Sequence, residues 1–298
     1  MRILLKVMIL TFDGGMYAIR IFSLSLQNRF IIHRKQKIKQ TDMHNNNNIT
    51  PSRPQKRAVV MGATSGIGLE VARQLAAEGW LVGIAGRRTG RLEQIEAETD
   101  GIVAHASIDV TADDAPERLM QLIETLGGID LYVHSAGIGW QNEALDEQKE
   151  LLTMGTNAMG FVRMVDAAFN HFARHAATQS GHIACITSIA RTRGLGAAPA
   201  YSAAKRMQSH YLECLDQLAR MRRLPITITD IRPGFVATDL IAGSHYPLQL
   251  SASSVAQSII KAIRRRRSTV VIDWRYRLLV AVWSLVPRWL WVRMRIGG

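Results

Sequence analysis

The sequence predicts an α/β fold: one doubly wound domain with a parallel sheet of about seven strands and helices on both faces, followed by a C-terminal amphipathic helical tail. Two observations predict it. Short apolar runs without strict alternation recur along the chain, which is typical of strands buried on both faces of a parallel sheet. Amphipathic segments of helical length lie between these runs. The 298 residues, 47% hydrophobic and 20% charged, suit one large α/β domain or two small ones and exclude a disordered chain.

The expected elements alternate along the middle of the chain. Short apolar runs bounded by turn residues predict strands at residues 58–62, 80–85, 102–107, 129–136, 182–188, 226–232 and 269–272. Amphipathic stretches predict helices at residues 66–78, 91–99, 112–126, 159–178, 200–222 and 251–264. Repeated strand–helix units of this kind imply right-handed crossovers and a doubly wound sheet.

The composition divides the chain into a leader (residues 1–56), the strand–helix domain (57–272) and a basic tail (273–298). In the leader, charged residues interrupt every apolar run before it reaches the roughly 18 residues of a membrane-spanning helix. We expect this leader to be disordered or untranslated, with translation starting at Met43 and residues 1–42 being an over-extended reading frame. A targeting or membrane-surface segment is the alternative.

The net charge of +13 is concentrated at the two ends of the chain. Residues 1–57 and 261–298 carry +9 each, whereas residues 58–260 carry −5. A nucleic-acid enzyme is expected to carry its positive charge on the folded face that meets the ligand, so the acidic body argues against nucleic acid as a partner. Basic ends rich in Leu, Ile and Trp favour an anionic membrane surface instead.

The two cysteines, Cys185 and Cys214, lie in a strand-like run and a helix-like run. Two cysteines exclude a disulfide scaffold, and no Cys/His set has the spacing of metal ligands. We therefore expect two buried reduced thiols, no metal, and a cytoplasmic protein, with peripheral membrane association left open by the basic tail.

A glycine-rich loop closes the first predicted strand and opens the first helix. Glycines here allow a tight turn and a close approach of the backbone to a pyrophosphate, while the helix points its free N–H groups at that anion. A structural turn is the alternative, but the strand–loop–helix context favours a nucleotide site in a Rossmann-type domain. The residues expected to bind the cofactor in this loop are Gly62, Thr64, Ser65, Gly66, Ile67 and Gly68.

The end of the second predicted strand indicates which nucleotide is bound. A carboxylate there would bind the ribose 2′-hydroxyl of NAD, but this chain has Arg87 and Arg88. Arginines form charge-assisted, forked hydrogen bonds to phosphate, so the pair favours NADP(H) over a merely solvated loop. After the third strand, Asp109 is placed to accept from the adenine amino group, with Val110 beside it, although a loop Asp also forms turns.

Four polar residues predict the catalytic site. Tyr201 and Lys205 are four residues apart in a helical stretch and therefore share a face. An ammonium close to a phenol lowers the pKa of the phenol, which suits proton exchange with a carbonyl or an alcohol. Such a pair alone is mostly chance. Ser188, however, ends a predicted buried strand in the ligand crevice, and Asn157 lies near the start of another long helix.

Together these motifs resemble those of the classical short-chain dehydrogenase/reductase family, over about residues 57–265. The order and spacing of the pieces make the resemblance highly specific. The matching pieces are residues 62–68, residues 134–137, Asn157, Ser188, residues 201–205 and residues 232–238. Met61, before the first glycine, and the pair His134 and Ser135 depart from the usual pattern, and we expect altered hydrogen bonding there rather than lost catalysis.

The resemblance implies a role for each catalytic residue. Tyr201 would be the general acid/base, and Lys205 would lower its pKa and bind the nicotinamide ribose. Ser188 would bond the substrate carbonyl and stabilise the developing oxyanion. Asn157 would hold a water that links Lys205 to solvent.

The resemblance also implies cofactor contacts beyond the glycine-rich loop, and a lid over the substrate formed by residues 239–250. These further cofactor contacts would come from Ala136, Gly137, Pro233, Gly234, Val236 and Thr238.

The tail combines four tryptophans with five arginines between residues 274 and 296. Its longest charge-free run, residues 278–287, is about half the length of a bilayer span, and Pro287 would break it. Tryptophan at a lipid boundary with snorkelling arginine suits a helix in the plane of a membrane surface. A helix that covers the pocket or packs on a partner subunit is the alternative.

The sequence therefore predicts an NADP(H)-dependent oxidoreductase that transfers a hydride between nicotinamide and a ketone or secondary alcohol. The apolar tail favours a lipid-like carbonyl substrate of the 3-oxoacyl or 3-ketosphinganine type. A non-catalytic NADP-binding sensor or scaffold of the same fold is the alternative. The family resemblance also suggests a homodimer or homotetramer formed through the predicted helices at residues 159–178 and 200–222.

Overall fold

The structure, a computed structural model, describes residues 6–13, 16–23, 55–239 and 248–296. The chain divides into two units, residues 1–51 and 52–298. In the first unit, strands β1 (Lys6–Asp13) and β2 (Met16–Ser23) pair in antiparallel fashion. These strands lie within the predicted leader, whose other residues up to 54 lie outside the described ones, so a start at Met43 stays a prediction.

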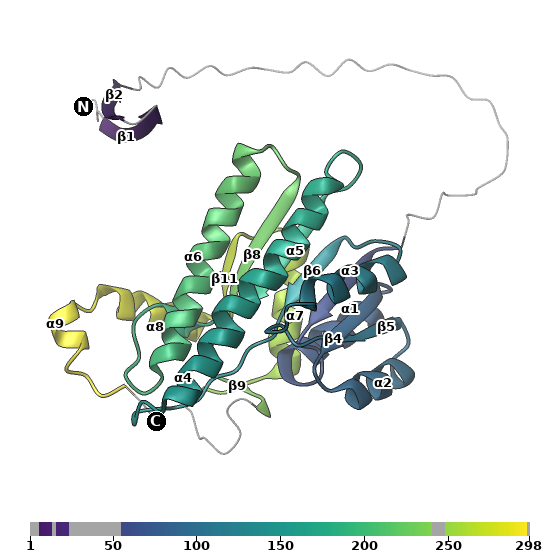
Figure 1. The fold of residues 1–298 in the computed structure, drawn as a ribbon. Coiled ribbons are helices and arrows are strands. Elements are labelled where there is room, and N and C mark those ends of the chain that lie inside the picture. The colour runs from purple at the N-terminus through teal and green to yellow at the C-terminus, as the bar shows by residue number, and fades with distance from the viewer. Residues whose placement is uncertain (1–5, 14–15, 24–54, 240–247, 297–298) are drawn as a thin grey trace, which may run out of the picture. The chain divides into compact units, whose positions relative to one another are not determined.

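The second unit is built on a seven-stranded sheet in the order β11–β8–β7–β6–β3–β4–β5, with every neighbouring pair parallel (Figure 1). All seven predicted strands are present, and their bounds lie within two residues of those predicted. The strands are β3 (Arg57–Met61), β4 (Leu81–Gly86), β5 (Ile102–Ser107), β6 (Leu131–His134), β7 (Gly181–Ile186), β8 (Ile226–Arg232) and β11 (Thr269–Val271).

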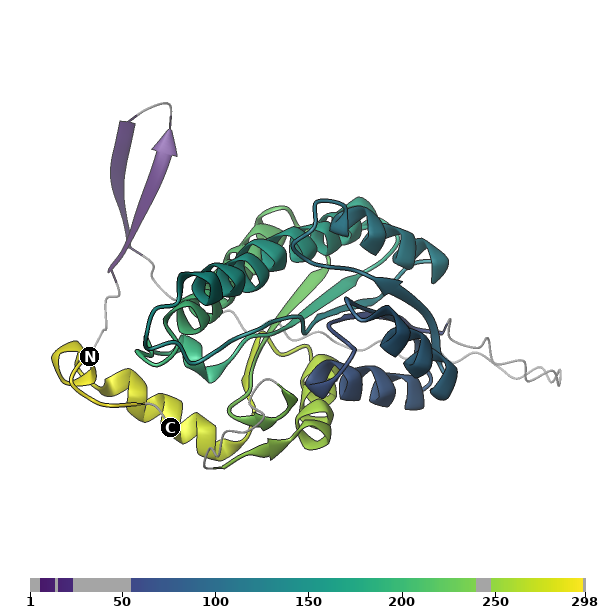
Figure 2. The same ribbon diagram turned by 60° about the horizontal axis from the view of Figure 1, so that its bottom comes forward.

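Helices cover both faces of this sheet, so the doubly wound fold is confirmed (Figure 2). One face carries α3 (Ala115–Thr125), α5 (Phe161–Arg174) and α6 (Pro199–Met221). The other face carries α1 (Gly66–Ala77), α2 (Thr89–Glu98) and α7 (Ala252–Arg264).

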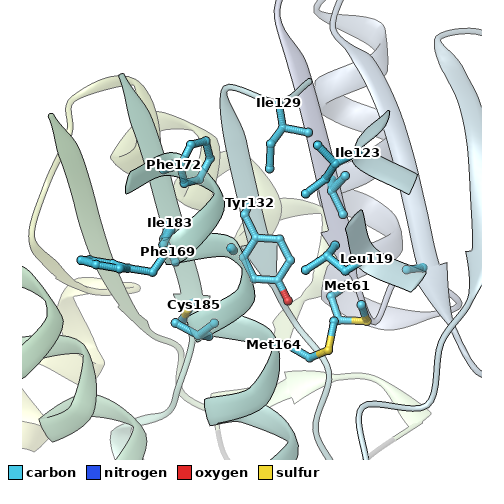
Figure 3. Close-up of a cluster of buried hydrophobic side chains, with 14 of the residues drawn as sticks. Met61, Leu119, Ile123, Ile129, Tyr132, Met164, Phe169, Phe172, Ile183 and Cys185 are labelled. Atoms are coloured by element: carbon cyan, nitrogen blue, oxygen red, sulfur yellow. The ribbon is translucent and has the colours of Figure 1, made fainter. Parts of the chain in front are cut away.

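The burial of both faces explains why the strands lack alternation. Val59 and Val60 are neighbours that point to opposite faces, and each is fully buried in a different hydrophobic cluster. In the cluster under α3 and α5, Tyr132 lies among Met61, Leu119 and Met164 (Figure 3). In a strand buried on both faces, an apolar side chain at every position stabilises the fold by its burial. Polar residues therefore lie mainly at the strand ends.

One predicted helix differs from the structure. The prediction at residues 159–178 corresponds to a longer helical rod made of α4 (Glu147–Met154), a π-helical turn (Gly155–Gly160) and α5. Of the residues of α4, only Thr153 is buried. Because α4 presents no apolar face to the core, its sequence has no amphipathic pattern from which a helix could be predicted.

After β8 the chain forms two short parallel strands, β9 (Val236–Ala237) and β10 (Leu250–Ser251). Residues 240–247, most of the predicted lid, lie outside the described residues. The predicted helical tail consists of α8 (Trp274–Leu285) and α9 (Arg288–Trp291), which meet at Pro287. No helix among the described residues is both long and apolar enough to cross a membrane.

Candidate active site

The carboxyl ends of the strands bring the predicted site residues to one edge of the sheet. The strand order reverses between β3 and β6, because the chain passes from β3 outward to β5 and then returns to pair β6 with β3. Ligands of doubly wound sheets bind at this switch point. The loops that follow β3, β6, β7 and β8 all leave the sheet at this edge.

The glycine-rich loop after β3 folds tightly against the loop after β6. Gly62 has a φ of +82°, and a Cβ there would lie 2.5 Å from the backbone nitrogen of Ala136. A Cβ at Gly68 would overlap the carbonyl oxygen of Gly62. Ser65 is the N-cap residue of α1, but its side chain does not cap the helix. The cradle and the N-terminus of α1 with its uncapped N–H groups fit a pyrophosphate.

The same loop contacts two other cofactor candidates. A Cβ at Gly66, whose φ is +57°, would lie 3.0 Å from Cγ2 of Thr238, so the loop after β8 reaches the start of α1. Arg88 donates from Nη2 to Oγ1 of Thr64 (2.7 Å) and to Oγ of Ser65 (2.8 Å). The guanidinium therefore lies over the predicted phosphate site with its charge exposed to a ligand.

The loop after β5 contains two predicted cofactor-binding residues, Asp109 and Val110. Asp109 Oδ1 accepts from the backbone nitrogen of Thr111 (2.9 Å) and from its hydroxyl (2.7 Å). Burial raises the pKa of Asp109, but these two bonds and the charge of Arg87 outweigh it and leave the pKa below its usual value. Val110 is buried against Gly160. Asp109 thus forms the turn that the sequence offered as the alternative, and its contact with adenine stays a prediction.

Three of the four predicted catalytic residues lie together. Tyr201 and Lys205 share a face of α6, with the Nζ of Lys205 5.7 Å from the centroid of the Tyr201 ring. Ser188 follows β7 in an extended conformation, is buried, and lies close enough to Tyr201 for its side chain to lower the pKa of the phenol. A Cβ at Gly139 would lie 2.5 Å from Cδ2 of Tyr201, so this glycine lets the loop after β6 pack on the phenol ring.

The expectation that Tyr201 has a lowered pKa is wrong for this structure. Burial raises the pKa of Tyr201 above its usual value, and the side chain of Ser188 only partly offsets the rise. The phenol is therefore protonated at neutral pH, in the form that donates a proton. This form suits the reduction of a carbonyl more directly than the oxidation of an alcohol.

Asn157 lies in the π-helical turn and is fully buried. Its side-chain amide forms two hydrogen bonds with the backbone of Ile138. Oδ1 accepts from the Ile138 nitrogen (2.9 Å), and Nδ2 donates to the Ile138 oxygen (2.6 Å). π-helical turns are rare in proteins, and those that occur are often at functional sites. The turn orients Asn157 toward the loop after β6, where a Cβ at Gly137 would lie 3.3 Å from its Oδ1 and 3.6 Å from the Nζ of Lys205.

The structure links Asn157 to Lys205 through Gln208, which the sequence analysis did not single out. Gln208 is fully buried, accepts from the Nζ of Lys205 (3.0 Å) and donates to the backbone oxygen of Asn157 (2.7 Å). Lys205 also donates to the backbone oxygen of Ile186 (3.0 Å). Burial lowers the pKa of Lys205 to about 8, although Cys185 and Asp230 act in the opposite direction.

The departures from the family pattern support the sheet. Met61 is fully buried in the core. His134 is buried at the end of β6, where its Nδ1 lies 3.0 Å from the hydroxyl of Tyr132. Burial and the charge of Lys205 lower the pKa of His134 to about 3, so the ring is neutral and is no proton donor at neutral pH.

The loop after β8 is anchored on both sides. The carbonyl of Pro233 accepts from the backbone nitrogen of Ile189 (3.0 Å), next to Ser188. A Cβ at Gly234 would overlap the ring of Tyr276, and the hydroxyl of Tyr276 accepts from the backbone nitrogen of Phe235 (3.1 Å). Buried Val236 pairs with Leu250 across β9 and β10. The predicted nicotinamide loop is therefore held by Tyr276 of α8 as well as by the sheet.

One further residue positions α6, the helix that carries Tyr201 and Lys205, and no sequence pattern indicates it. Glu150 of α4 accepts at Oε2 from the backbone nitrogen of Ala200 (2.9 Å), in the first turn of α6. Its other oxygen accepts from Nδ2 of Asn142 (2.7 Å). A carboxylate at a helix N-terminus is stabilising, and here it fixes the turn that carries Tyr201.

Known proteins resemble this chain over most of its length. The sequence profile of a family described as short chain dehydrogenase matches residues 56–246. An uncharacterized oxidoreductase of Myxococcus xanthus (strain DK1622) is 31% identical over 240 residues, covering 78% of this chain and 93% of that protein. Dehydrogenase/reductase SDR family member 7B of Bos taurus is 28% identical over 255 residues, covering 77% of each chain.

Solved structures share the fold. A 3-ketoacyl-(acyl-carrier-protein) reductase from Brucella melitensis complexed with NADH superposes with a TM-score of 0.67 at 21% identity, covering 73% of this chain and 96% of that chain. A variant of actinorhodin polyketide ketoreductase with NADPH gives a TM-score of 0.63 at 23% identity, with coverages of 73% and 95%.

Proposed function

The chain belongs to the short-chain dehydrogenase family, and on that premise we propose that it is an NADPH-dependent reductase of a hydrophobic, lipid-like ketone, with Tyr201 as the proton donor. As a member of this family it is an oxidoreductase that uses a nicotinamide cofactor. The observation that carries the proposal is the cluster of Tyr201, Ser188 and Lys205 beside the glycine-rich cradle.

The residues of the cluster divide the proton chemistry between them. The hydroxyls of Ser188 and Tyr201 bind the oxygen of a substrate ketone, and the Tyr201 hydroxyl donates its proton to that oxygen as the carbonyl becomes an alcohol. A reduced nicotinamide, when bound, supplies the hydride to the carbonyl carbon. The ammonium of Lys205 stabilises the phenolate left on Tyr201, because an opposite charge nearby favours the ionised form.

The preference for NADPH is supported by Arg88. Its guanidinium is held over the start of the glycine-rich loop by Thr64 and Ser65, and no carboxylate ends β4, which finishes at Gly86. Nε and Nη2 donate to Thr64 and Ser65, so the guanidinium offers a phosphate its Nη1 donors and its positive charge. A ribose 2′-hydroxyl would leave this charge unmatched, so NADH is expected to bind more weakly.

Two observations support a lipid-like substrate: the substrates in the names of the similar reductases, and the exposed apolar side chains near the site. The two solved structures are a ketoacyl reductase and a polyketide ketoreductase. Apolar Trp140 and Leu248 are exposed on loops that leave the catalytic edge of the sheet. We expect a long-chain 3-oxoacyl thioester or a long-chain ketone to be reduced in preference to a short ketone.

The oligomer predicted from the family resemblance remains part of the proposal. Exposed apolar side chains within the two predicted helices, residues 159–178 and 200–222, such as Met159 and Met221, are candidates for a subunit interface. Light scattering of the purified chain should give the mass of a dimer or tetramer, and a monomer at all concentrations would contradict it.

The proposed reaction is tested by following NADPH absorbance with a panel of long- and short-chain ketones. Tyr201→Phe should abolish turnover and leave NADPH binding intact. Tyr211→Phe on the same helix is the matched control, because Tyr211 bonds Asp166 away from the cluster (2.7 Å) and its loss should leave turnover near that of the native enzyme. Full turnover by Tyr201→Phe would remove Tyr201 from its role. NADPH binding without turnover of any ketone would favour the sensor or scaffold instead.

A further inference from the structure

The C-terminal segment, residues 274–296, exposes an unusual amount of apolar surface. Eight of the eighteen large hydrophobic side chains that are exposed among the described residues belong to it. On α8, Trp274, Leu278, Val282 and Leu285 are between 51% and 83% exposed and follow one another at intervals of four, four and three residues. This spacing places them on one face of the helix. Trp289, Leu290, Val292 and Met294 add exposed apolar surface beyond Pro287.

The other side of the segment is anchored to the catalytic domain. Tyr276 is buried, and its hydroxyl donates to the backbone oxygen of Leu248 (3.0 Å). Arg193 donates to the carbonyls of Trp283, Ser284 and Val286 at the end of α8. The segment is therefore a docked element with an exposed apolar face. In Figure 2 it lies outside the helix–sheet–helix sandwich (yellow).

Trp291 completes the docking of the second helix. It is buried, donates from its indole nitrogen to the backbone oxygen of Gly194 (2.8 Å) and lies edge-on to Trp283 with ring centroids 5.3 Å apart. The guanidinium of Arg193 lies 5.8 Å from the centroid of the Trp291 ring. Two tryptophans of this segment are thus used to fix it, while Trp274 and Trp289 remain on the outside.

The charge of the segment decides between the possible occupants of its apolar face. Residues 273–296 contain five arginines and one acid, Asp273, which pairs with Arg275 (2.9 Å), so the segment keeps an excess of four positive charges. In a symmetric dimer through this face, each patch would meet its own copy, and the arginines would oppose one another. An anionic lipid surface instead attracts the arginines and accepts the apolar side chains. Arginine and tryptophan are also the side chains that settle at the level of lipid headgroups.

We propose that the face formed by α8, α9 and the residues up to 296 docks in the plane of an anionic lipid bilayer. The docked face adjoins the substrate loops, since Tyr276 of α8 packs on Gly234 and binds both Phe235 and Leu248. Given the reductase activity proposed above, on which this step rests, a ketone dissolved in the bilayer would then reach the site without crossing water. The enzyme would act on lipids at the membrane surface.

The test is flotation of the full-length protein with vesicles of phosphatidylcholine, with and without phosphatidylglycerol. We expect the protein to float with the anionic vesicles, to bind neutral ones at least tenfold more weakly, and to be released by salt. Leu278→Ser with Leu285→Ser should reduce flotation at least tenfold. Leu151→Ser with Leu152→Ser on α4 is the matched control, because these leucines are also more than half exposed, and it should float like the native protein.

The charge of the segment is tested separately with Arg277→Gln and Arg288→Gln, which should remove the preference for anionic vesicles. All variants keep the basic residues 1–57, so a loss is assigned to the C-terminal face. Flotation that is absent, or that falls equally in the α4 control, would overturn the proposal. A lower oligomeric mass of the Leu278/Leu285 variant, without flotation of the native protein, would assign the face to a second copy of the chain. Turnover of a water-soluble ketone is measured in parallel. It tests the reductase proposal without membranes, so failure of that proposal can be told apart from failure of the lipid-docking proposal.

Discussion

The two ends of the predicted cofactor site are built from hydrogen bonds of similar length in very different surroundings. At the nicotinamide end, Lys205, Gln208 and Asn157 are at most 5% exposed and joined by bonds of 2.7–3.0 Å. At the adenosine end, Arg88 binds Thr64 and Ser65 at 2.7–2.8 Å, but the arginine is exposed. Buried groups that lose a partner stay unsatisfied, whereas exposed groups exchange it for water. The buried end is therefore fixed by the fold, and the exposed end is free to be rearranged by a ligand.

The largest effect is expected from removing the charge at the buried end. Lys205→Met should lower kcat for ketone reduction roughly a thousandfold, within the range of general acid–base contributions. In the native enzyme, reduction should decline as the pH rises through the pKa of Lys205, about 8, because the ammonium that stabilises the phenolate is lost. The variant should lack this decline. Lys149→Met on the exposed side of α4 is the control and should keep both kcat and the decline.

The next effect concerns the glycine-rich loop that joins the two ends. Gly62 and Gly79 have nearly the same φ, +82° and +83°, but only Gly62 is packed against another backbone. Alanine at Gly79 should cost about 1 kcal/mol of unfolding free energy, from the left-handed backbone alone. Alanine at Gly62 adds a steric overlap and should cost about 2–3 kcal/mol more. Denaturant unfolding measures the difference, and equal losses would show that the overlap is relieved.

The sequence predicts the strands and the site motifs, but it does not predict contacts between distant residues or the effect of burial on a pKa. The seven strands of the parallel sheet follow from apolar runs, and motifs indicate Tyr201, Lys205 and Ser188, whereas the two-residue strands β9 and β10 were not predicted. The bonds from Gln208 to Asn157 and from Ala200 to Glu150 could not be predicted because they join residues 51 and 50 positions apart in the chain. The spacing of three between Lys205 and Gln208 on α6 is the local signal that could have found Gln208. The pKa of Tyr201 was predicted in the wrong direction because spacing reports that Lys205 is near and says nothing of burial, the larger effect here.

At the exposed end, the effect should be smaller and confined to one cofactor. Arg88→Ala removes a charge-assisted bond to the 2′-phosphate, worth about 1.5–3 kcal/mol. The KM for NADPH should therefore rise roughly 10- to 100-fold while the KM for NADH and kcat stay nearly unchanged. Arg91→Ala is the control, since Arg91 bonds Gln94 on α2 (2.7 Å). A parallel rise for both cofactors would mean that Arg88 organises the loop and does not select the phosphate.

The smallest effect, and the sharpest test of the comparison, comes from Gln208. Gln208→Leu removes an acceptor from the Lys205 ammonium, so the pKa of Lys205 should fall, the basic decline of activity should move to lower pH, and kcat near neutral pH should drop about tenfold. Gln208→Glu places a carboxylate at the same position, which should raise the pKa of Lys205 and move the decline to higher pH. Gln148→Leu, exposed on α4, should leave the profile in place. If the pH of the decline falls in Gln208→Leu and rises in Gln208→Glu, Gln208 must contact Lys205 electrostatically. A packing defect alone would shift the pH of the decline in the same direction in both variants, or in neither.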